Sequence, residues 1–397
     1  MQSGDQLLEQ LSQVVPMPTK LDRLELLLND YLACLVDAST PNVRSLADDG
    51  VIGFGAYLSL LSSSKDRDDV DWSLGSHIGS VIWSTIFALA LKNPDLRKNA
   101  VSAALSGYRA SASVTTFFGP SHRSKWHVTA TAGSVAAASA ASVMLGLSPS
   151  AHQHALRLAM SNMGGSSKAP REREGAGGFN RAAATTLGIV AALSDARSID
   201  ELWDGPGGLL QLYSITGGDA IVVDGLSTSG IRPFPTNGFS QSAVLASAQL
   251  SVRSKGQLRS IEAHIAHGVV PLVDGSRGGT WWNLRFAVAG AWISGDPTTF
   301  TAAPEIEKLV TIVPSDLPIG GVILVAHSSE GEDKFAQLSP PGMALEVPQE
   351  RAWAQAKWNA MAGEKATELA RMSRECIAGS EGQIIWKFLE SFRFATH

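Results

Sequence analysis

Residues 126–149 read WHVTATAGSVAAASAASVMLGLSP, and this stretch sets the expected character of the first half of the chain. Alanine, glycine and serine dominate positions 133–145, which predicts a helix whose small side chains let neighbouring helices approach closely. Ser148 followed by Pro149 is typical of an N-cap and a first helical position, so we expect a second helix from there through Met160. The first 225 residues are therefore expected to form a tightly packed, mostly buried helical domain.

Helical spacing of apolar residues recurs on either side of that stretch. Leucine and tyrosine fall on one face of positions 19–36, and the segments 81–91 and 181–193 are also typical of helices. Glycine and proline then interrupt the chain between Gly230 and Gly238, which indicates a domain boundary.

The sequence beyond this boundary has a different pattern. Short β-branched runs at 258–269, 308–313 and 321–327 are typical of strands, and 285–293 is typical of a helix, which together predict an α+β module. Positions 350–374 are helical again and are expected to return to the first domain. The prediction is a mainly α chain with a helical domain over 1–228 and 350–397 and a smaller inserted α+β domain over 229–349.

The composition excludes several classes of protein. Lysine and arginine total 32 against 37 acidic residues, without the basic tract that nucleic-acid binding needs. The N-terminus lacks the basic start and apolar core of a signal peptide, and no apolar run reaches the roughly 20 residues that span a membrane. Cys34 and Cys376 lie far apart and outside any metal-type spacing, which fits a reducing compartment. We expect a cytoplasmic protein without nucleic-acid or membrane partners.

His127 is the first candidate catalytic residue. It precedes the alanine-rich helix, behind a cluster of hydroxyl residues and glycine. The partial positive charge of a helix N-terminus favours a neutral imidazole, which can act as a base. The alternative is a histidine that only caps the helix or packs in the core.

A second candidate cluster combines carboxylates with a histidine. Asp68, Asp69 and Asp71 come six to nine positions before His77, which stands at the expected start of another helix. A carboxylate and an imidazole in one cleft could share acid and base work. The alternative is a solvated acidic loop that caps the helix. The histidines and carboxylates never adopt a tight metal-ligand spacing, so we expect no metal.

The segment 164–178 is rich in glycine and carries Lys168, Arg171 and Arg173. Arginine could bind a carboxylate or phosphate through two parallel hydrogen bonds, and lysine could bind it as a point charge. The segment does not match a phosphate-binding Walker loop, and a solvated surface loop is the alternative.

Several segments, in the same order along nearly the whole chain, resemble the MmgE/PrpD family of 2-methylcitrate dehydratase, cis-aconitate decarboxylase and iminodisuccinate epimerase. Positions 75–80, GSHIGS, are similar to the family's His-Pro-Gly-Ser stretch, and 125–133, KWHVTATAG, to its His-x-Thr-x-Thr-x-Gly segment. The remaining similar segments are an alanine-rich helix, a Gly-Pro turn, an Arg-Pro-Phe-Pro motif and a helix that ends in glycine, at 182–192, 203–208, 232–235 and 282–295.

This resemblance implies a large all-α domain built from both chain ends, an inserted α+β lid, a cleft between them, and a homodimer. It implies enzymes that need no metal or organic cofactor and that dehydrate, decarboxylate or epimerise small di- or tricarboxylates. His77 and His127 match family active-site histidines, and Asp69 or Asp71 matches the acidic position. Thr129 and Gln241 fall at further positions expected to bind substrate.

The chain also departs from the family pattern. The lysine expected before the alanine-rich helix is absent, which leaves Lys168, Arg171, Arg173 or Arg181 as possible replacements. In the second domain the expected lysine is Arg232, the expected histidine is Ser240 or Gln241, and the expected tyrosine is Phe286. Arginine binds anions but rarely shuttles protons, so a citrate-type substrate is not assured.

The expected reaction is a β-elimination from a small anionic metabolite, with loss of water or, from a phosphorylated substrate, of phosphate. His127 or His77 would remove a proton, the other histidine or the cluster at 68–71 would assist the leaving group, and Arg232 with Lys168 or Arg171 would hold the anion. Two alternatives are a decarboxylase or epimerase on the same scaffold and a non-catalytic binding or scaffold protein.

Overall fold

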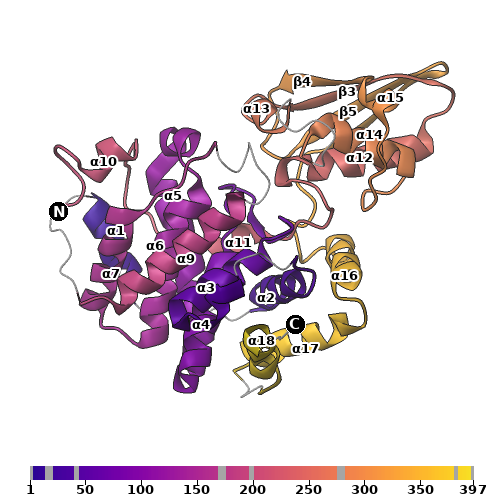
Figure 1. Cartoon of the computed structure of the whole chain (residues 1–397). Helices are drawn as coiled ribbons and strands as arrows, with labels where there is room; N and C mark the ends of the chain where they lie inside the picture. The colour runs from indigo at the N-terminus through magenta and orange to yellow at the C-terminus, as the bar shows by residue number, and fades with distance from the viewer. Residues whose placement is uncertain are drawn as a thin grey trace. The chain divides into compact units, whose positions relative to one another are not determined.

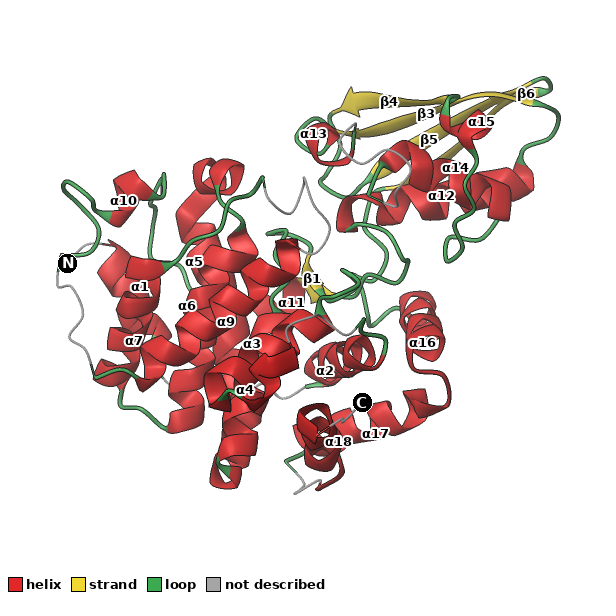
Figure 2. Cartoon of the chain, in the orientation of Figure 1, coloured by secondary structure: helices red, strands yellow, loops and turns green. Residues whose placement is uncertain are grey.

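The computed structural model describes residues 3–13, 21–39, 44–168, 176–195, 201–274, 282–379 and 383–394. The chain forms two compact units, Met1–Ser229 with Met361–His397 and, inserted between these segments, Gly230–Ala360. Helices make up most of the first unit, whereas the second combines helices with a sheet (Figure 1, Figure 2). The chain is therefore mainly α, as its sequence predicts.

The first unit is a helical bundle that draws on both ends of the chain. The C-terminal α17 packs against α2, and α18 packs against α4 (Figure 1). Its helices are α1 Ser3–Leu11, α2 Asp22–Val36, α3 Gly50–Ser62, α4 Gly79–Lys92, α5 Ala100–Lys125, α6 Val128–Leu145, α7 Pro149–Asn162, α9 Ala176–Leu193, α10 Leu209–Leu212, α11 Gly225–Thr228, α17 Ala366–Ile377 and α18 Gln383–Phe394. Short 3-10 turns η1 Arg44–Asp48, η2 Pro94–Asn99 and η4 Gly363–Lys365 join some of them, and β1 Val70–Asp71 pairs with β2 Ser229–Gly230.

The centre of this unit is α6, which packs against α4, α5, α7 and α9. A Cβ built on Gly188 of α9 would lie 2.2 Å from the Cβ of Ala137 in α6, so the two helices meet at a distance that only small residues permit. The helix begins at Val128, earlier than expected, and ends at Gly146, whose φ of 65° only glycine adopts readily. The predicted N-cap of α7 is confirmed, because the Ser148 side chain accepts a hydrogen bond from Ala151 N.

Among the described helices, α6 is the one long and apolar enough to cross a membrane by length and composition. However, 89% of its apolar window is buried inside the protein. Burial on all sides by other helices is the property of a core helix, which accounts for its apolar composition.

The second unit contains a four-stranded sheet in the order β4-β3-β5-β6. Strand β3 (Leu258–Ala266) runs parallel to β4 (Val310–Ser315) and antiparallel to β5 (Val322–Ser328), and β5 pairs antiparallel with β6 (Gly331–Gln337). Helices α12 (Gln241–Arg253) and α14 (Leu284–Ser294) pack against the strands (Figure 2). The remaining elements are η3 Gly238–Ser240, α13 Val270–Val273, α15 Pro304–Glu307 and α16 Pro348–Ala362.

The second unit ends after Ala360, whereas the sequence placed the junction after residue 349. The reason is that most of α16 belongs to this unit. Trp353 of α16 makes an edge-on ring contact with Phe234, at 5.8 Å between ring centroids. Phe234 is buried in the core of the second unit and Trp353 packs partly buried against it, so this contact anchors α16 to that core.

A buried histidine joins α7 to the interior of the bundle. His152 is 3% exposed, and its Nε2 lies 3.1 Å from the Ser139 hydroxyl, which in turn lies 2.8 Å from the Ser106 hydroxyl. Burial, with a smaller contribution from the positive charge of Arg109, lowers the pKa of His152 to about 4. The folded protein therefore holds this imidazole neutral at pH values where an unfolded chain protonates it.

We expect Gly188→Ala to destabilise the first unit by about 1 to 3 kcal/mol, because the added methyl overlaps the backbone and Cβ of α6. Urea unfolding followed by circular dichroism measures the loss. Gly218→Ala is the matched control, since a Cβ at Gly218 meets nothing within 4 Å. Equal stability of the two variants would show that α6 and α9 are not in close contact.

We expect acid to destabilise the protein partly through His152. Between its ordinary pKa of about 6.5 and its folded value of about 4, the unfolded state binds more protons, so stability falls as the pH drops through this range. The contribution lost between pH 7 and pH 4.5 is about 2 to 3 kcal/mol. His152→Gln removes it, so the stability difference between variant and wild type should change with pH. A difference that is the same at both pH values would contradict this account.

Candidate active site

The turn before His77 is built by Asp71. One of its carboxylate oxygens accepts hydrogen bonds from Ser73 N at 3.0 Å, from Ser73 Oγ at 2.8 Å and from Leu74 N at 3.1 Å. The other accepts from the Thr228 hydroxyl at 2.9 Å. Burial raises the pKa of Asp71, and these hydrogen bonds oppose that rise. Asp71 therefore shapes the loop that leads to His77, and its proposed catalytic role stays a prediction.

The contacts that hold His77 include two hydrogen bonds. Its backbone N–H donates to the Thr129 hydroxyl at 3.0 Å, and its Nδ1 lies 2.7 Å from the Asp69 carbonyl oxygen. A carbonyl only accepts, so Nδ1 carries the hydrogen, and the lone pair of the neutral ring is on Nε2. This tautomer presents a base at Nε2. The hydroxyl of Thr129, expected to bind substrate, holds His77 in place.

Asp69 links His77 to the start of α4. Its carboxylate oxygens both accept from Gly79 N, at 2.9 Å each, while its carbonyl accepts from the His77 ring. A Cβ on Gly79 would stand 2.8 Å from that carboxylate, which explains the glycine two residues after the histidine. A carboxylate at a helix N-terminus is stabilised by the helix dipole. Asp69 therefore positions the imidazole and the helix together.

His127 is the N-cap of α6, as the sequence suggests. Its backbone N–H donates to Gly165 O at 2.9 Å, and its Nδ1 accepts from the Asn180 side-chain amide, Nδ2, at 3.0 Å. With Nδ1 accepting, the hydrogen of the neutral ring is on Nε2. His127 and His77 thus present opposite tautomers, a hydrogen-bond donor and a base. Both are tied to the first turn of α6, because Thr129 lies two residues after His127.

The sequence offered one weak signal for Asn180. That signal is its place in the first turns of α9, directly after the glycine-rich segment. Its neighbour Arg181 is predicted only as a possible replacement for the family lysine. Arg181 instead forms a buried ion pair with Asp68, at 2.9 Å, and a second one with Asp66, at 3.2 Å. The side chains of Arg181 and Asp68 are 3% and 2% exposed. This pair fixes α9 against the loop before β1. The charge of Arg181 is thus already paired within the protein, and its role as a replacement for the family lysine stays a prediction.

Lys168 is exposed beside the chain that leads to His127. Ser166 forms a β-bridge with Trp126, and Ser167 N donates to Lys125 O at 3.2 Å, so this segment runs alongside residues 125–127. The substrate-binding role of Lys168 stays a prediction. Arg171 and Arg173 lie outside the described residues.

Two expected substrate-binding residues belong to the second unit. Arg232 is 1% exposed there. The Gln241 amide is occupied by the loop before it: Oε1 accepts from Phe234 N at 3.0 Å, and Nε2 donates to Phe234 O at 2.9 Å and to Thr236 O at 3.0 Å. Gln241 therefore clamps this loop, and its contact with substrate stays a prediction, as does that of Arg232.

Arg123 was not singled out by the sequence. It lies in the last turn of α5, beyond a break at Gly119, whose φ of 75° interrupts the helix before Pro120. Its Nη2 is 3.7 Å from where a Cβ of Gly75 would stand. The guanidinium group is therefore beside the turn that carries His77. Burial lowers the pKa of Arg123, and the negative charge of Asp71 opposes that effect.

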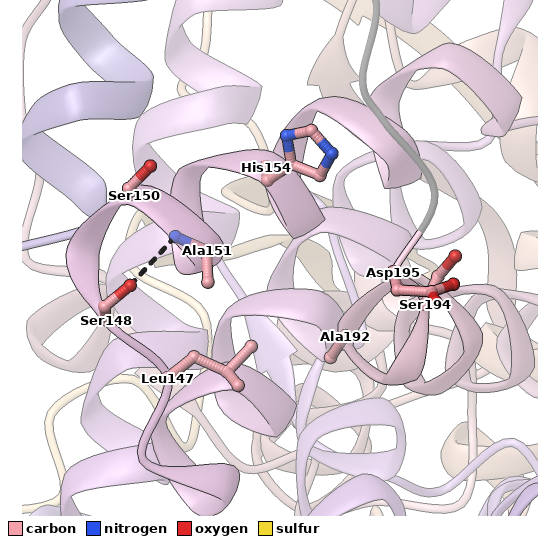
Figure 3. A pocket seen from close by; sticks show the side chains of 8 residues that line it. All are labelled: Leu147, Ser148, Ser150, Ala151, His154, Ala192, Ser194 and Asp195. Carbon is pink, nitrogen blue, oxygen red and sulfur yellow. Dashed lines mark hydrogen bonds between the residues drawn. The ribbon is translucent and has the colours of Figure 1, made fainter.

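A surface hollow of about 310 Å³ lies at the far end of α6 from the two histidines, lined by the start of α7 and the end of α9 (Figure 3). α6 has 18 residues and is about 27 Å long at 1.5 Å per residue. His127 precedes its first residue, whereas Leu147, which lines the hollow, follows its last. The hollow is thus distinct from the histidine site, and we assign it no chemistry.

The described part of the chain contains no group of three or more histidine, cysteine or carboxylate side chains arranged to hold a metal ion.

Residues 55–219 match the family model of the MmgE/PrpD N-terminal domain. This range contains His77, His127, Asn180 and the carboxylates that position them. Residues 55–219 therefore belong to the MmgE/PrpD family, which includes dehydratases and related enzymes and whose members are mostly enzymes. A search among curated proteins found no match to the chain.

We expect nitrogen-15 NMR of the histidine rings to find His77 protonated on Nδ1 and His127 on Nε2 at neutral pH. The reason is that a carbonyl accepts from His77 and an amide donates to His127. Asn180→Ala should remove the tautomer preference of His127 and leave that of His77 unchanged. The same tautomer on both rings of the wild-type protein would contradict the geometry.

Proposed function

We propose that this protein is a lyase that eliminates a small group from an anionic metabolite, with His77 as the base and His127 as a hydrogen-bond donor. The observation that carries this proposal is the pair of opposite tautomers at the first turn of α6. Membership of a family that includes dehydratases supports elimination as the reaction. We propose a small di- or tricarboxylate that loses water, or a phosphate ester that loses phosphate, as substrate.

In the proposed reaction, Nε2 of His77 takes a proton from the carbon next to a carboxylate. The electrons of the broken C–H bond form the new C=C bond while the bond to the leaving oxygen breaks. The proton on His77 then passes to the departing hydroxide, which leaves as water and restores the neutral imidazole. A phosphate leaving group would depart by the same bond changes and take the proton from His77, leaving as hydrogen phosphate and restoring the neutral imidazole.

His127 supports this step from Nε2–H. A neutral imidazole at a helix N-terminus can donate a hydrogen bond to the oxygen on which negative charge develops, because the dipole disfavours its protonated form. Asn180 keeps the ring in this state by donating to Nδ1. The first turns of α4 and α6 add partial positive charge, which favours an anionic substrate.

The same base and donor would also serve decarboxylation or epimerisation, and the products distinguish the three. Elimination releases water or phosphate and forms an alkene, which ultraviolet absorbance and proton NMR detect. Decarboxylation releases carbon dioxide. Epimerisation in heavy water incorporates deuterium without loss of mass from the carbon skeleton. A panel of hydroxy di- and tricarboxylates and their phosphate esters, incubated with the purified protein, tests the proposal.

We expect His77→Gln and His127→Gln each to lower kcat by roughly 10²- to 10⁴-fold while the protein stays folded, because each group acts in the chemical step. His154→Gln is the control, since His154 lies at the hollow beyond the far end of α6 and should keep activity within about twofold. Full activity in folded His77→Gln and His127→Gln variants would rule out this mechanism. Absence of any product with the whole panel would favour a binding or scaffold protein.

A further inference from the structure

Arg123 differs from Arg157 and Arg181, two other arginines of the first unit, because their charges are paired with carboxylates. Arg157 pairs with Asp5 at 2.7 Å, and Arg181 pairs with Asp68 at 2.9 Å. Arg123 is partly buried, yet it makes no hydrogen bond or ion pair with any residue that the structure describes. Arginine stays protonated in proteins, so the guanidinium keeps its charge in this position.

The nearby acid does not neutralise this charge by contact. Asp71 is close enough to influence Arg123 electrostatically, but its two carboxylate oxygens are engaged by Ser73, Leu74 and Thr228. A guanidinium that is partly removed from water and lacks a contacting anion is unfavourable on its own. Such a group gains most from an anion that arrives from outside the protein.

The location of Arg123 connects it to the proposed chemistry. Its Nη2 is within van der Waals distance of Gly75, two residues before His77, at 3.7 Å from the position of a Cβ. Its backbone is four residues before His127. Arg123 therefore stands next to the turn that carries the base, on the chain segment that leads to the hydrogen-bond donor.

We propose that Arg123 binds the anionic group of the substrate, a carboxylate or a phosphate, beside His77. This inference rests on the proposed function and names a substrate-binding residue for it. The planar guanidinium offers two parallel N–H donors, which match the two oxygens of a carboxylate or phosphate. Held there, the anion places its neighbouring carbon near the base.

Calorimetric titration of the whole protein with citrate and, separately, with inorganic phosphate tests this assignment. We expect the wild type to bind at least one of the two anions and Arg123→Gln to bind it at least about tenfold more weakly, because a charge-assisted pair is lost. Arg123→Lys should fall between them, since lysine keeps the charge but loses the bidentate geometry.

Lys125→Gln is the matched control. It removes one positive charge two residues away on the same helix, where the exposed Lys125 ammonium contacts only the Ser214 hydroxyl, at 2.8 Å, among the described residues. It should leave the affinity within about twofold of wild type. If Lys125→Gln and Arg123→Gln lost the same affinity, the loss would reflect the overall positive charge of this region. That result would overturn the assignment of Arg123.

Nitrogen-15 NMR of arginine side chains in the wild-type protein provides a test that does not depend on whether variants fold. The Arg123 Nε signal should shift during titration with the bound anion, and that of Arg157 should not. Anion binding without a shift at Arg123, or with undiminished affinity in Arg123→Gln, overturns this inference and leaves the proposed function standing. Failure of the wild type to bind either anion counts against both.

Discussion

The close contact between α6 and α9 is the constraint on which the candidate site depends. Gly188 brings α9 so near to Ala137 that a single added methyl group would collide with α6. At this separation Asn180, two turns earlier in α9, reaches the ring of His127 at the start of α6. Alanine and glycine in this region therefore do more than fill space, because they fix which polar groups meet where the helices begin.

The site also shows how a hydrogen bond to a main-chain carbonyl or from a side-chain amide can select the tautomer of an imidazole. The carbonyl of Asp69 and the amide of Asn180 each contact one nitrogen, and they leave the two histidines with opposite protonation patterns. The carboxylate of Asp69 is used at the same time by Gly79 at the start of α4. The position of the base and the start of a core helix are thus set by one residue.

The sequence was informative where chemistry and local pattern coincide. His127 could be recognised near the start of a helix, and the GSHIGS segment placed His77 at the start of another. The glycines of that segment stand in a tight turn and beside the buried carboxylate of Asp69. The sequence could not distinguish the roles of Asp69 and Asp71. Asp69 binds the nearby Gly79, whereas Asp71 binds Thr228, which is distant along the chain and which only the fold brings close. Strand β6 escaped notice because GEDKFAQ is a polar edge strand. Asn180 and Arg123 gain their positions only when distant helices pack.

The buried pair of Arg181 and Asp68 has a further consequence for α9. Successive residues of a helix differ in direction by about 100°, so a shift of one residue would turn Asn180 away from His127. Only one rotation of α9 about its axis is compatible with both the ion pair near its start and the glycine contact in its middle. The orientation of Asn180 is therefore fixed by packing and not by the number of residues in the connection before α9. That connection can gain or lose residues in a related sequence while the histidine site keeps its geometry.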